Sequence, residues 1–573
     1  MTTHFSPTDP PLNDYPRPQL ARSRWQNLNG LWEYAIQPAN VSQPPAHWKG
    51  QILVPFCIES AGSGVQRPLR PGEALWYHRS FAVDGYDPCL RTLLHFGAVD
   101  ESCQVWVNGQ KAGGHRGGYL PFHFEISKLL RQGDNELLVR VTDDTGASGR
   151  AHGKQSLTPG GIWYTAVSGI WQTVWLEQVP QKFLRGLAIT PDLTGVTVAP
   201  STLESGPVRL RVYDGGNLVA ECYGEGPQRL QIPHPKLWTP ETPHLYRLTA
   251  DFGQDHVESY FGLRTFSVEP DSSGFARLCL NGRPYFQKGL LDQGYWPDGL
   301  YTAPTDEALF SDIVAAKRLG FNLLRKHVKV EAARWYYHCD RLGMLVWQDM
   351  PNGGLTGLNF TNSALPYLGV HVRDGNYRRF GRLDESVRRE FLAQLAGMVR
   401  TLYNAASICL WGPFNEGWGQ FDSREAARLV RRADPTRLID AASGWHDQGA
   451  GDIRSMHRYV LRLYAPKPEE RRAFCLTEYG GYSYIVPEHI WKENGKKQGF
   501  GYRMYPDRAA LTAAYCRLHQ EQVLPLLPKG LSACIYTQLT DVETEVNGLL
   551  TYDRAACKVD ERAVLAVNQA LVL

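Results

Sequence analysis

The chain has 573 residues, of which 43% are hydrophobic and 21% charged, and its formal net charge is +3. The composition is that of a globular protein. The chain is too long for one ordinary core, so two to four domains are expected, one of which could be a barrel of about 250 residues. The scattered arginines give no basic field for nucleic acid, and no apolar run could span a bilayer. Neither nucleic acid nor a membrane is therefore expected as a partner.

The N-terminal stretch MTTHFSPTDPPLNDYPRPQL is polar and proline-rich, without the basic start and apolar core of a secretory signal. We therefore expect a cytoplasmic location. The 11 cysteines are an odd number, lie mostly in apolar runs and show no CxxC spacing. They predict buried thiols rather than a disulfide framework or a zinc site. No metal and no cofactor is predicted.

Residues 1–180 contain short alternating segments separated by Gly, Asn and Pro turns, such as LWYHRSFAV and NELLVRVTD. The pair Asn108-Gly109 stands between two alternating runs and predicts a tight hairpin. These residues are therefore expected to form an all-β sandwich. Residues 181–272 repeat the pattern with fewer strands, which is typical of a smaller immunoglobulin-like sandwich.

From residue 273 to 573 the pattern changes, because helical segments such as PTDEALFSDIVAAKRLG now alternate with short apolar runs. Alternation of strands and helices predicts a parallel sheet. The candidate strands are YFQKGLL, FNLLRKH, MLVWQDM, SICLWGP, RLIDAAS, DIRSMHR, AFCLTEY and SACIYTQ. Eight strands over about three hundred residues predict a (β/α)8 barrel, in which chemistry gathers at the C-terminal strand ends.

Two carboxylates fall at such strand ends. Glu416, in WGPFNEGWGQ, follows the fourth predicted strand, and Glu478, in CLTEYGGYSY, ends the seventh. Two carboxylates that face one pocket suit glycosidic bond hydrolysis, where one protonates the leaving oxygen and the other attacks or stabilises the anomeric carbon. A single carboxylate at a barrel top more commonly caps a helix or pairs with arginine, but the pairing of strands four and seven favours the catalytic interpretation.

The motifs GPFNEGWG and LTEYGG, preceded by LWYHRSF and GGIWYTAVSGIWQTVWLE, resemble those of glycoside hydrolase family 2. That family includes β-galactosidases, β-glucuronidases and β-mannosidases, and other segments are similar to a bacterial β-galactosidase-like subgroup. The resemblance extends from about Trp25 to Arg554. It implies a multidomain fold with an N-terminal sugar-binding jelly-roll β-sandwich, an immunoglobulin-like β-sandwich and a C-terminal (β/α)8 TIM barrel.

The resemblance also implies roles for individual residues. Glu416 matches the general acid/base and Glu478 the nucleophile, while Arg325 matches an arginine near the nucleophile. Asn415 would hydrogen-bond the 2-hydroxyl of the sugar. Tyr459 resembles a tyrosine that hydrogen-bonds the nucleophile, although the sequence DIRSMHRYV departs from the family pattern and leaves His457 as a rival.

Several further residues are candidates by position alone. Asp292, Lys326, His327 and Asp349 each follow a barrel strand and could contact hydroxyl groups, or they could equally pair with their neighbours. Aromatic residues could form a wall of the sugar pocket, although packing is the commoner role for each one. These aromatic candidates are Trp347, Trp491 and Tyr536.

The predicted function is a retaining exo-β-glycosidase of the β-galactosidase type. The β-glucuronidase pattern Asn-x-Lys is absent after the last strand, where Asn547 has no lysine two residues later, and Gln538 stands where a β-galactosidase tryptophan is expected. Specificity for β-glucuronides, galacturonides or α-L-arabinopyranosides therefore stays an alternative, as does an inactive carbohydrate-binding protein. A homo-oligomer is also left open, since exposed β-sandwiches often pack between subunits.

Overall fold

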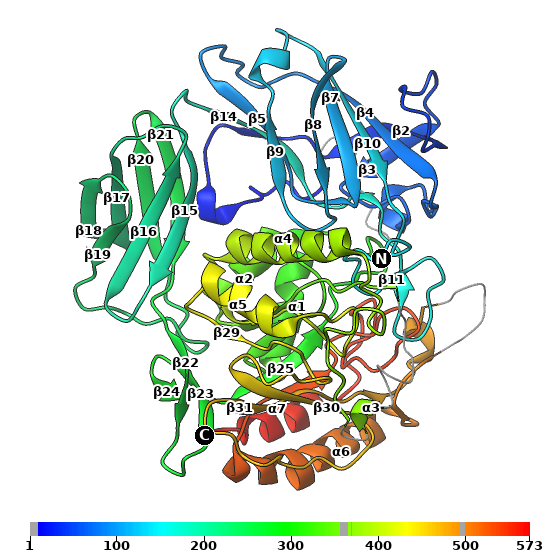
Figure 1. The fold of residues 1–573 in the computed structure, drawn as a ribbon, viewed down its shortest axis with the longest axis vertical. Helices are drawn as coiled ribbons and strands as arrows, with labels where there is room; N and C mark the ends of the chain where they lie inside the picture. Colours follow the sequence, from blue (N-terminus) through cyan, green and yellow to red (C-terminus); the bar gives the residue numbers. More distant parts are fainter. Residues whose placement is uncertain (1–9, 356–364, 368–369, 492–498) are drawn as a thin grey trace.

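The computed structural model describes residues 10–355, 365–367, 370–491 and 499–573. It contains two β-sandwiches and one barrel, and the N-terminal sandwich lies above the barrel with helix α4 between them (Figure 1). The second sandwich packs at the side of both. This arrangement agrees with the three-part fold that the sequence predicts.

The N-terminal sandwich pairs a sheet of order β1-β14-β5-β9 with one of order β3-β2-β4-β10-β7-β8. Both sheets contribute to one apolar core, which includes Trp32, Phe96 and Val139. In the predicted hairpin Asn108 and Gly109 have φ angles of 52° and 76°, as a type I′ turn requires. The strands are β1 (Trp25–Asn27), β2 (Gly30–Pro38), β3 (Gly50–Val54), β4 (Glu73–Phe81), β5 (Arg91–Phe96), β6 (Val99–Asp100), β7 (Ser102–Val107), β8 (Gln110–Arg116), β9 (Phe122–Glu125), β10 (Asn135–Thr142), β11 (Gln155–Ser156), β12 (Tyr164–Thr165), β13 (Gly169–Ile170) and β14 (Val174–Val179).

The second sandwich is smaller and packs a sheet of order β15-β16-β19 on one of order β18-β17-β20-β21. All of its strand pairs are antiparallel. Alternating inward residues such as Val208, Leu210 and Val212 form its separate core. The strands are β15 (Leu184–Pro191), β16 (Gly195–Thr202), β17 (Val208–Asp214), β18 (Asn217–Gly224), β19 (Gln228–Gln231), β20 (Tyr246–Phe252) and β21 (Asp255–Phe261).

All eight predicted barrel strands are present and parallel, in the order β29-β28-β27-β26-β25-β34-β31-β30. A backbone hydrogen bond from Asp452 N to Ile439 O nearly closes the ring between β29 and β30. A small sheet of β22 (Phe266–Pro270), β23 (Ala276–Leu280) and β24 (Arg283–Pro284) packs Leu278 and Leu280 against the barrel interior. The barrel strands are β25 (Gln287–Asp292), β26 (Leu323–Lys326), β27 (Leu345–Asp349), β28 (Ile408–Gly412), β29 (Leu438–Ile439), β30 (Ile453–Arg458), β31 (Ala473–Gly480) and β34 (Leu531–Thr537).

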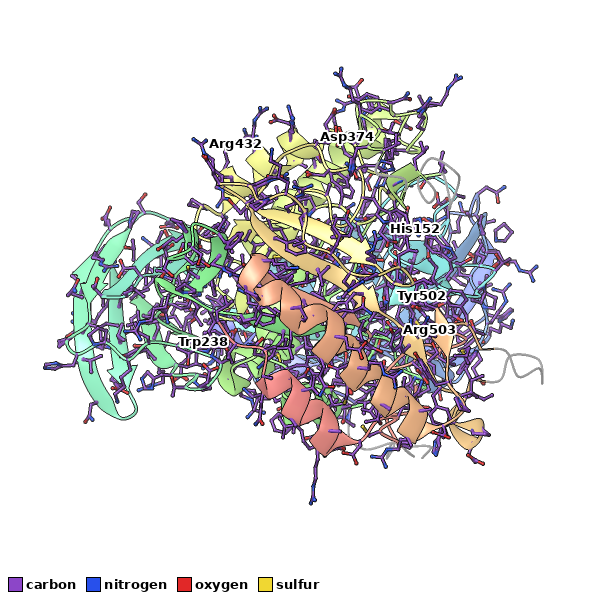
Figure 2. The ribbon with its side chains drawn as sticks, turned by 90° about the horizontal axis from the view of Figure 1, so that it is seen from below. His152, Trp238, Asp374, Arg432, Tyr502 and Arg503 are labelled. Carbon is purple, nitrogen blue, oxygen red and sulfur yellow. The ribbon has the colours of Figure 1, made fainter. Side chains whose placement is uncertain are left out.

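Helices cover the outside of the barrel, and α1, α4, α6 and α7 each begin after a residue whose side chain caps the helix. Helix α1 starts after Thr305, whose side chain accepts a hydrogen bond from Ala308 N, and it ends with Lys317 and Arg318. Helices α6 and α7 lie side by side on one face (Figure 2). The helices are α1 (Asp306–Arg318), α2 (Ala333–Leu342), α3 (Leu365–Tyr367), α4 (Glu385–Leu402), α5 (Ser423–Ala433), α6 (Arg508–Leu518) and α7 (Glu561–Gln569).

The barrel departs from the ideal alternation at two connections. Residues 440–452 and 459–472 are described throughout and form no helix. The first is rich in Gly and Asp, and the second contains two prolines, which favour turns over helices. Among the described residues no helix combines the length and apolarity needed to cross a membrane. All 11 cysteines are free thiols.

Candidate active site

Glu416 and Glu478 meet above the C-terminal end of the barrel. Glu478 lies within β31, whereas Glu416 lies in the turn after β28 with a φ of 50°, and its backbone nitrogen donates to Ser443 O. A positive φ is unfavourable for a residue with a side chain and is common at functional sites. Only 5% of Glu416 and 3% of Glu478 is exposed. The fold therefore buries both carboxylates at the same end of the barrel.

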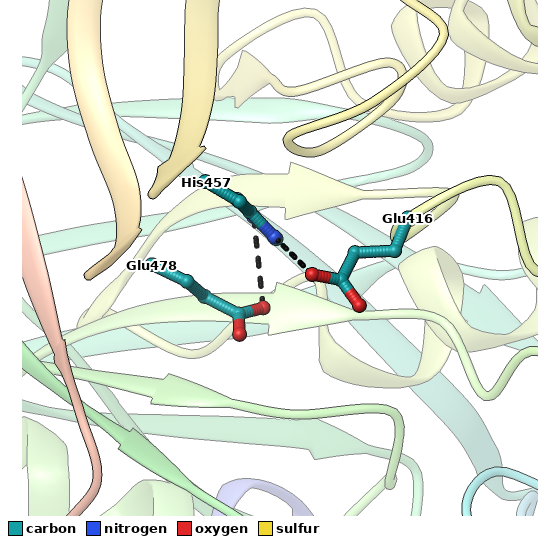
Figure 3. Close-up of side chains that lie close together, drawn as sticks. All are labelled: Glu416, His457 and Glu478. Atoms are coloured by element: carbon teal, nitrogen blue, oxygen red, sulfur yellow. Dashed lines mark hydrogen bonds and ion pairs between the residues drawn. The ribbon is translucent and has the colours of Figure 1, made fainter. Parts of the chain in front are cut away.

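His457, near the end of β30, bridges the two carboxylates (Figure 3). Its Nδ1 lies 2.8 Å from Glu416 Oε1, and its Nε2 lies 3.6 Å from Glu478 Oε1 and 3.1 Å from Ser443 Oγ. One nitrogen or oxygen from each of the three side chains lies within 4.8 Å of the others. The residue that the sequence left as a rival to Tyr459 thus contacts the predicted acid/base.

The environment shifts the pKa values of the two carboxyl groups in opposite directions. Burial raises the pKa of Glu416, the hydrogen bond from His457 opposes that rise, and the negative charge of Glu478 adds to it. Burial would also raise the pKa of Glu478, but the electrostatic interactions with His457 and Arg325 outweigh it and lower the pKa to about 2. Glu478 is therefore held ionised, while Glu416 retains a proton more readily.

Arg325, on β26, links the residues around Glu478. Its Nη1 lies 3.1 Å from Glu478 Oε1, its Nη2 lies 2.9 Å from Asn415 Oδ1, and its Nε lies 2.9 Å from Asp349 Oδ2. The guanidinium is almost completely buried. The planar fork thereby holds a nucleophile candidate, an amide and a third carboxylate in fixed positions.

Tyr459 donates a hydrogen bond from its hydroxyl group to Glu478 Oε2. Burial and the negative charge of Glu478 raise the pKa of this tyrosine well above its ordinary value, so the hydroxyl stays protonated. The ring also stacks on Tyr502, with 4.0 Å between the ring centroids. This is the contact that the family resemblance implies for Tyr459.

Three buried polar atoms around this cluster have no hydrogen-bond partner among the described residues: Asn415 Nδ2, His327 Nε2 and Trp418 Nε1. His327 Nδ1 donates to Asp349 Oδ2 at 2.8 Å, and burial lowers the pKa of His327 well below its usual range, so the ring is neutral and its Nε2 is an acceptor. Buried polar atoms normally find partners. Two donors and one acceptor are thus left to bind a polar ligand beside the carboxylates.

Two position-based candidates lie on the other face of the sheet. Lys326 Nζ lies 2.7 Å from Asp292 Oδ2 and 3.3 Å from Glu331 Oε2, and it stands over the ring of Trp335 on α2. Because successive residues of a strand point to opposite faces, Arg325 points into the barrel and Lys326 toward the helices. The structure does not bring Lys326 and Asp292 to the carboxylate pair, so the geometry gives no support to their predicted contact with sugar.

The aromatic candidates are also separate from the pair. Tyr536 packs edge-on against Tyr515 of α6, and its hydroxyl accepts a hydrogen bond from Tyr482 N. Trp347 lies in the barrel interior, where its Nε1 donates to Gln287. Trp491 is half-buried and packs edge-on against Tyr552. None of these three rings has a described contact with Glu416 or Glu478, so the predicted aromatic wall finds no support.

Lys154 of the N-terminal sandwich is a site residue that the sequence does not reveal. Its Nζ lies 5.6 Å from the ring centroid of Trp418 and 5.5 Å from that of Tyr164. The positive charge of Lys154 acts to lower the pKa of both Glu416 and Glu478. No local pattern around residue 154 could have placed it there, because the contact joins two domains.

The same three residues that form the carboxylate pair and its bridge could in principle hold a metal ion, as could Glu101, Asp143 and Asp144 in the N-terminal sandwich. In the first group His457 Nδ1 already hydrogen-bonds Glu416 Oε1, and in the second Arg150 pairs with Glu101. A cavity of about 380 Å³ lies elsewhere, at the junction of both sandwiches and helices α1 and α2. Neither carboxylate of the pair lines it.

Residues 25–180 match the sugar binding domain of glycosyl hydrolases family 2, residues 200–264 match a second model of that family, and residues 277–482 match its TIM barrel domain. Together these matches cover well over half of the chain.

Individual relatives carry different names. The chain is 26% identical over 516 residues to a putative beta-glucuronidase from Formosa agariphila, covering 80% of this chain and 57% of the relative. It is 24% identical over 525 residues to a beta-galactosidase from Photobacterium profundum, covering 79% and 47%. The chain therefore spans about half the length of the curated relatives that it matches.

Solved structures share the fold over nearly the whole chain. A beta-D-glucuronidase from Dictyoglomus thermophilum has a TM-score of 0.74 at 18% identity, covering 97% of this chain and 98% of that one. A beta-galacturonidase from Eisenbergiella tayi, bound to galacturonate, has a TM-score of 0.72 at 20% identity, covering 97% and 99%. From its three matched domains and this architecture, we conclude that the chain belongs to glycosyl hydrolases family 2.

Proposed function

We propose that this protein is a retaining exo-β-glycosidase in which Glu478 is the nucleophile and Glu416 the general acid/base. The observation that carries this proposal is the pair of carboxylates joined by His457, with the pKa of one raised and that of the other lowered to about 2. A double displacement needs an ionised nucleophile and a protonated acid at the same time.

In the first step Glu478 attacks the anomeric carbon and Glu416 protonates the leaving oxygen, which forms a covalent glycosyl-enzyme. In the second step Glu416, now ionised, removes a proton from water, and that water releases the sugar. Tyr459 and Arg325 hold the oxygens of Glu478 in place. Asn415 Nδ2 is the free donor that would meet the 2-hydroxyl.

Two geometric features support the retaining and exo assignments. Oxygens of Glu416 and Glu478 approach within 4.8 Å, which suits a retaining pair, separated by about 5 to 5.5 Å, better than an inverting pair, separated by roughly 6.5 to 9.5 Å. Both carboxylates are at least nine-tenths buried. A terminal sugar can enter such a site more readily than the middle of a polysaccharide.

Two classes of sugar compete for this site. The relatives named beta-galactosidase support a β-galactoside as the substrate. One relative and several solved structures are named for glucuronides or galacturonides, and these support a uronide. An inactive sugar-binding protein is the rival of another class, but binding alone would not require two carboxylates with opposed pKa shifts.

The assignment is tested with Glu478→Gln and Glu416→Gln on a panel of 4-nitrophenyl β-glycosides, with the exposed Glu385→Gln as the matched control. We expect kcat to fall at least 1000-fold in Glu478→Gln and to stay unchanged in the control. In Glu416→Gln, azide should restore turnover and give a β-glycosyl azide, because azide needs no general base. Near wild-type turnover by Glu478→Gln, or an α-configured first product from the wild type, would refute the mechanism.

A further inference from the structure

Lys154 is unusual among the buried lysines of this chain. Four lysines are at least 95% buried in the described residues: Lys154, Lys326, Lys329 and Lys558. Lys326 pairs with Asp292, Lys329 with Glu331, and Lys558 with Asp541. Lys154 alone has neither an ion pair nor a hydrogen-bond acceptor for its ammonium group within the described part of the chain. A buried charge without a partner is strongly unfavourable unless something else supplies one.

The sandwich segment that carries Lys154 is fixed on the barrel. Backbone nitrogens of His152 and Gly153 both donate to Asn352 O at 2.9 Å. The side chain of Asn352 in turn accepts a hydrogen bond from Asn415 N, also at 2.9 Å. One barrel residue therefore positions both Lys154 and the Asn415-Glu416 turn. This double anchor makes the placement of the cation a built feature rather than a chance approach.

The aromatic neighbours of the Lys154 ammonium group place it beside the site. It stands near the ring of Trp418, two residues beyond Glu416, and near the ring of Tyr164. The hydroxyl of Tyr164 donates to Glu545, which also accepts from Asn547 Nδ2 at 2.8 Å. The Glu545 carboxylate thus has donors of its own. Rings contribute a cation–π attraction, which is weaker than a charge-assisted hydrogen bond.

Two other buried cations, Arg325 at the site and Lys326 on the other face of the sheet, are already neutralised. Arg325 pairs with Asp349 and Glu478, and Lys326 pairs with Asp292 and Glu331. Neither can therefore replace the lysine of the β-glucuronidase pattern Asn-x-Lys, which is absent after Asn547 in the loop that follows strand eight. We propose that Lys154 binds the carboxylate of the terminal sugar, so that the substrates are β-linked hexuronic acids, the glucuronide or galacturonide class. This inference rests on the proposed glycosidase function and specifies its substrate.

A carboxylate on the sugar would also help the acid catalyst. In the free protein the charge of Lys154 acts to lower the pKa of Glu416, which opposes the protonated state that the first step needs. Binding of an anion neutralises Lys154 and removes that effect. The pKa of Glu416 should then be higher in the complex with a uronide than in the complex with the matching neutral sugar.

The first test compares kcat/KM for 4-nitrophenyl β-D-glucuronide and β-D-galacturonide with kcat/KM for the matching glucoside and galactoside. We expect the wild type to prefer at least one uronide over its neutral counterpart. Lys154→Met should lower that preference ratio about 10- to 150-fold, the effect of losing one charge-assisted hydrogen bond. Lys154→Arg should keep part of the ratio, and the exposed Lys111→Met should leave it unchanged. A wild type that prefers the neutral sugars, or an equal loss on both classes in Lys154→Met, would overturn the proposal.

The second test separates this proposal from the proposed mechanism, because it needs no turnover. Binding of D-glucuronate, D-galacturonate and D-galactose is measured by calorimetry with Glu478→Gln and with Glu478→Gln/Lys154→Met. We expect a uronate to bind the single variant at least tenfold more tightly than the double variant, with no such change for galactose. Equal uronate affinity in both variants would refute the role of Lys154, even if the glycosidase mechanism were correct. Near wild-type turnover by Glu478→Gln, with intact, Lys154-dependent uronate binding, would refute the mechanism alone.

Discussion

Glu416 is the residue where stability and function oppose each other. Burial raises the pKa of its carboxyl group in the folded protein, whereas an unfolded glutamate has a pKa of about 4.3. Above that pH the unfolded chain therefore accommodates the ionised carboxylate better than the folded protein does, and the ionised group lowers stability. Such conflicts are common at catalytic positions.

We accordingly expect Glu416→Gln to raise Tm by about 1 to 3 °C at pH 7.5. The gain should shrink as the pH falls and vanish below about pH 4, where the carboxyl group is protonated in both the folded and the unfolded state. Differential scanning calorimetry of the wild type and the variant at both pH values measures this. The exposed Glu385→Gln provides the baseline. A lower Tm for the variant at pH 7.5 would contradict the assigned direction of the pKa shift.

At the scale of the single element, the side-chain alternation along β26 determines which of two adjacent cationic residues points into the site. The chain order Arg325-Lys326 forces one side chain into the barrel and the other toward α2. Both residues were candidates for sugar binding because both lie at the end of a strand. The alternation of side chains along that strand places them on opposite faces of the sheet. The same alternation places Trp347 inside the barrel and Tyr536 against α6.

We therefore expect Lys326→Met to affect stability rather than sugar binding. The substitution leaves Asp292 buried without its cation, whereas Glu331 keeps Lys329, and breaking a buried pair costs about 3 to 5 kcal/mol. Tm should fall, while KM of the folded fraction should stay within about twofold of the wild-type value. Thermal unfolding and steady-state kinetics check the two effects. A large increase in KM with an unchanged Tm would instead make Lys326 a substrate-binding residue.

The sequence is informative about elements and much less so about contacts between domains. Eight barrel strands could be predicted because each is a short apolar run bounded by turns and followed by a helix or a Gly-rich or Pro-rich loop. Glu416 and Glu478 could be predicted because a position after a strand defines a position at the barrel mouth. Lys154 could not, since its place depends on backbone hydrogen bonds to Asn352, almost two hundred residues away in the chain. Tertiary contacts of this kind leave no local periodicity to find.

At the scale of the whole molecule, the site is shared between the barrel and the N-terminal sandwich, and Arg382 ties the two together. Its Nη1 donates to Gly149 O of the sandwich at 2.7 Å, and its Nε donates to Gly419 O at 2.8 Å, three residues beyond Glu416. The guanidinium is buried against the rings of Phe391 and Phe421. Burial lowers the pKa of Arg382 to about 9. One side chain thus joins the segment that carries Lys154 to the turn that carries Glu416.

Arg382→Lys is the variant that tests this connection, because a single ammonium group on a shorter, non-planar side chain cannot reproduce the two-pronged contact. We expect backbone amides of residues 149–155 and 416–420 to exchange hydrogen about tenfold faster. Those of α7, on the side of the barrel away from the N-terminal sandwich (Figure 1), should keep the wild-type rate. Since Lys154 and Glu416 both lose their fixed positions, kcat/KM should fall about 10- to 100-fold. Hydrogen exchange with mass spectrometry and steady-state kinetics measure the two effects, with the exposed Arg389→Lys of α4 as the control. Unchanged exchange in both loops would show that the sandwich and the barrel hold the site together without Arg382.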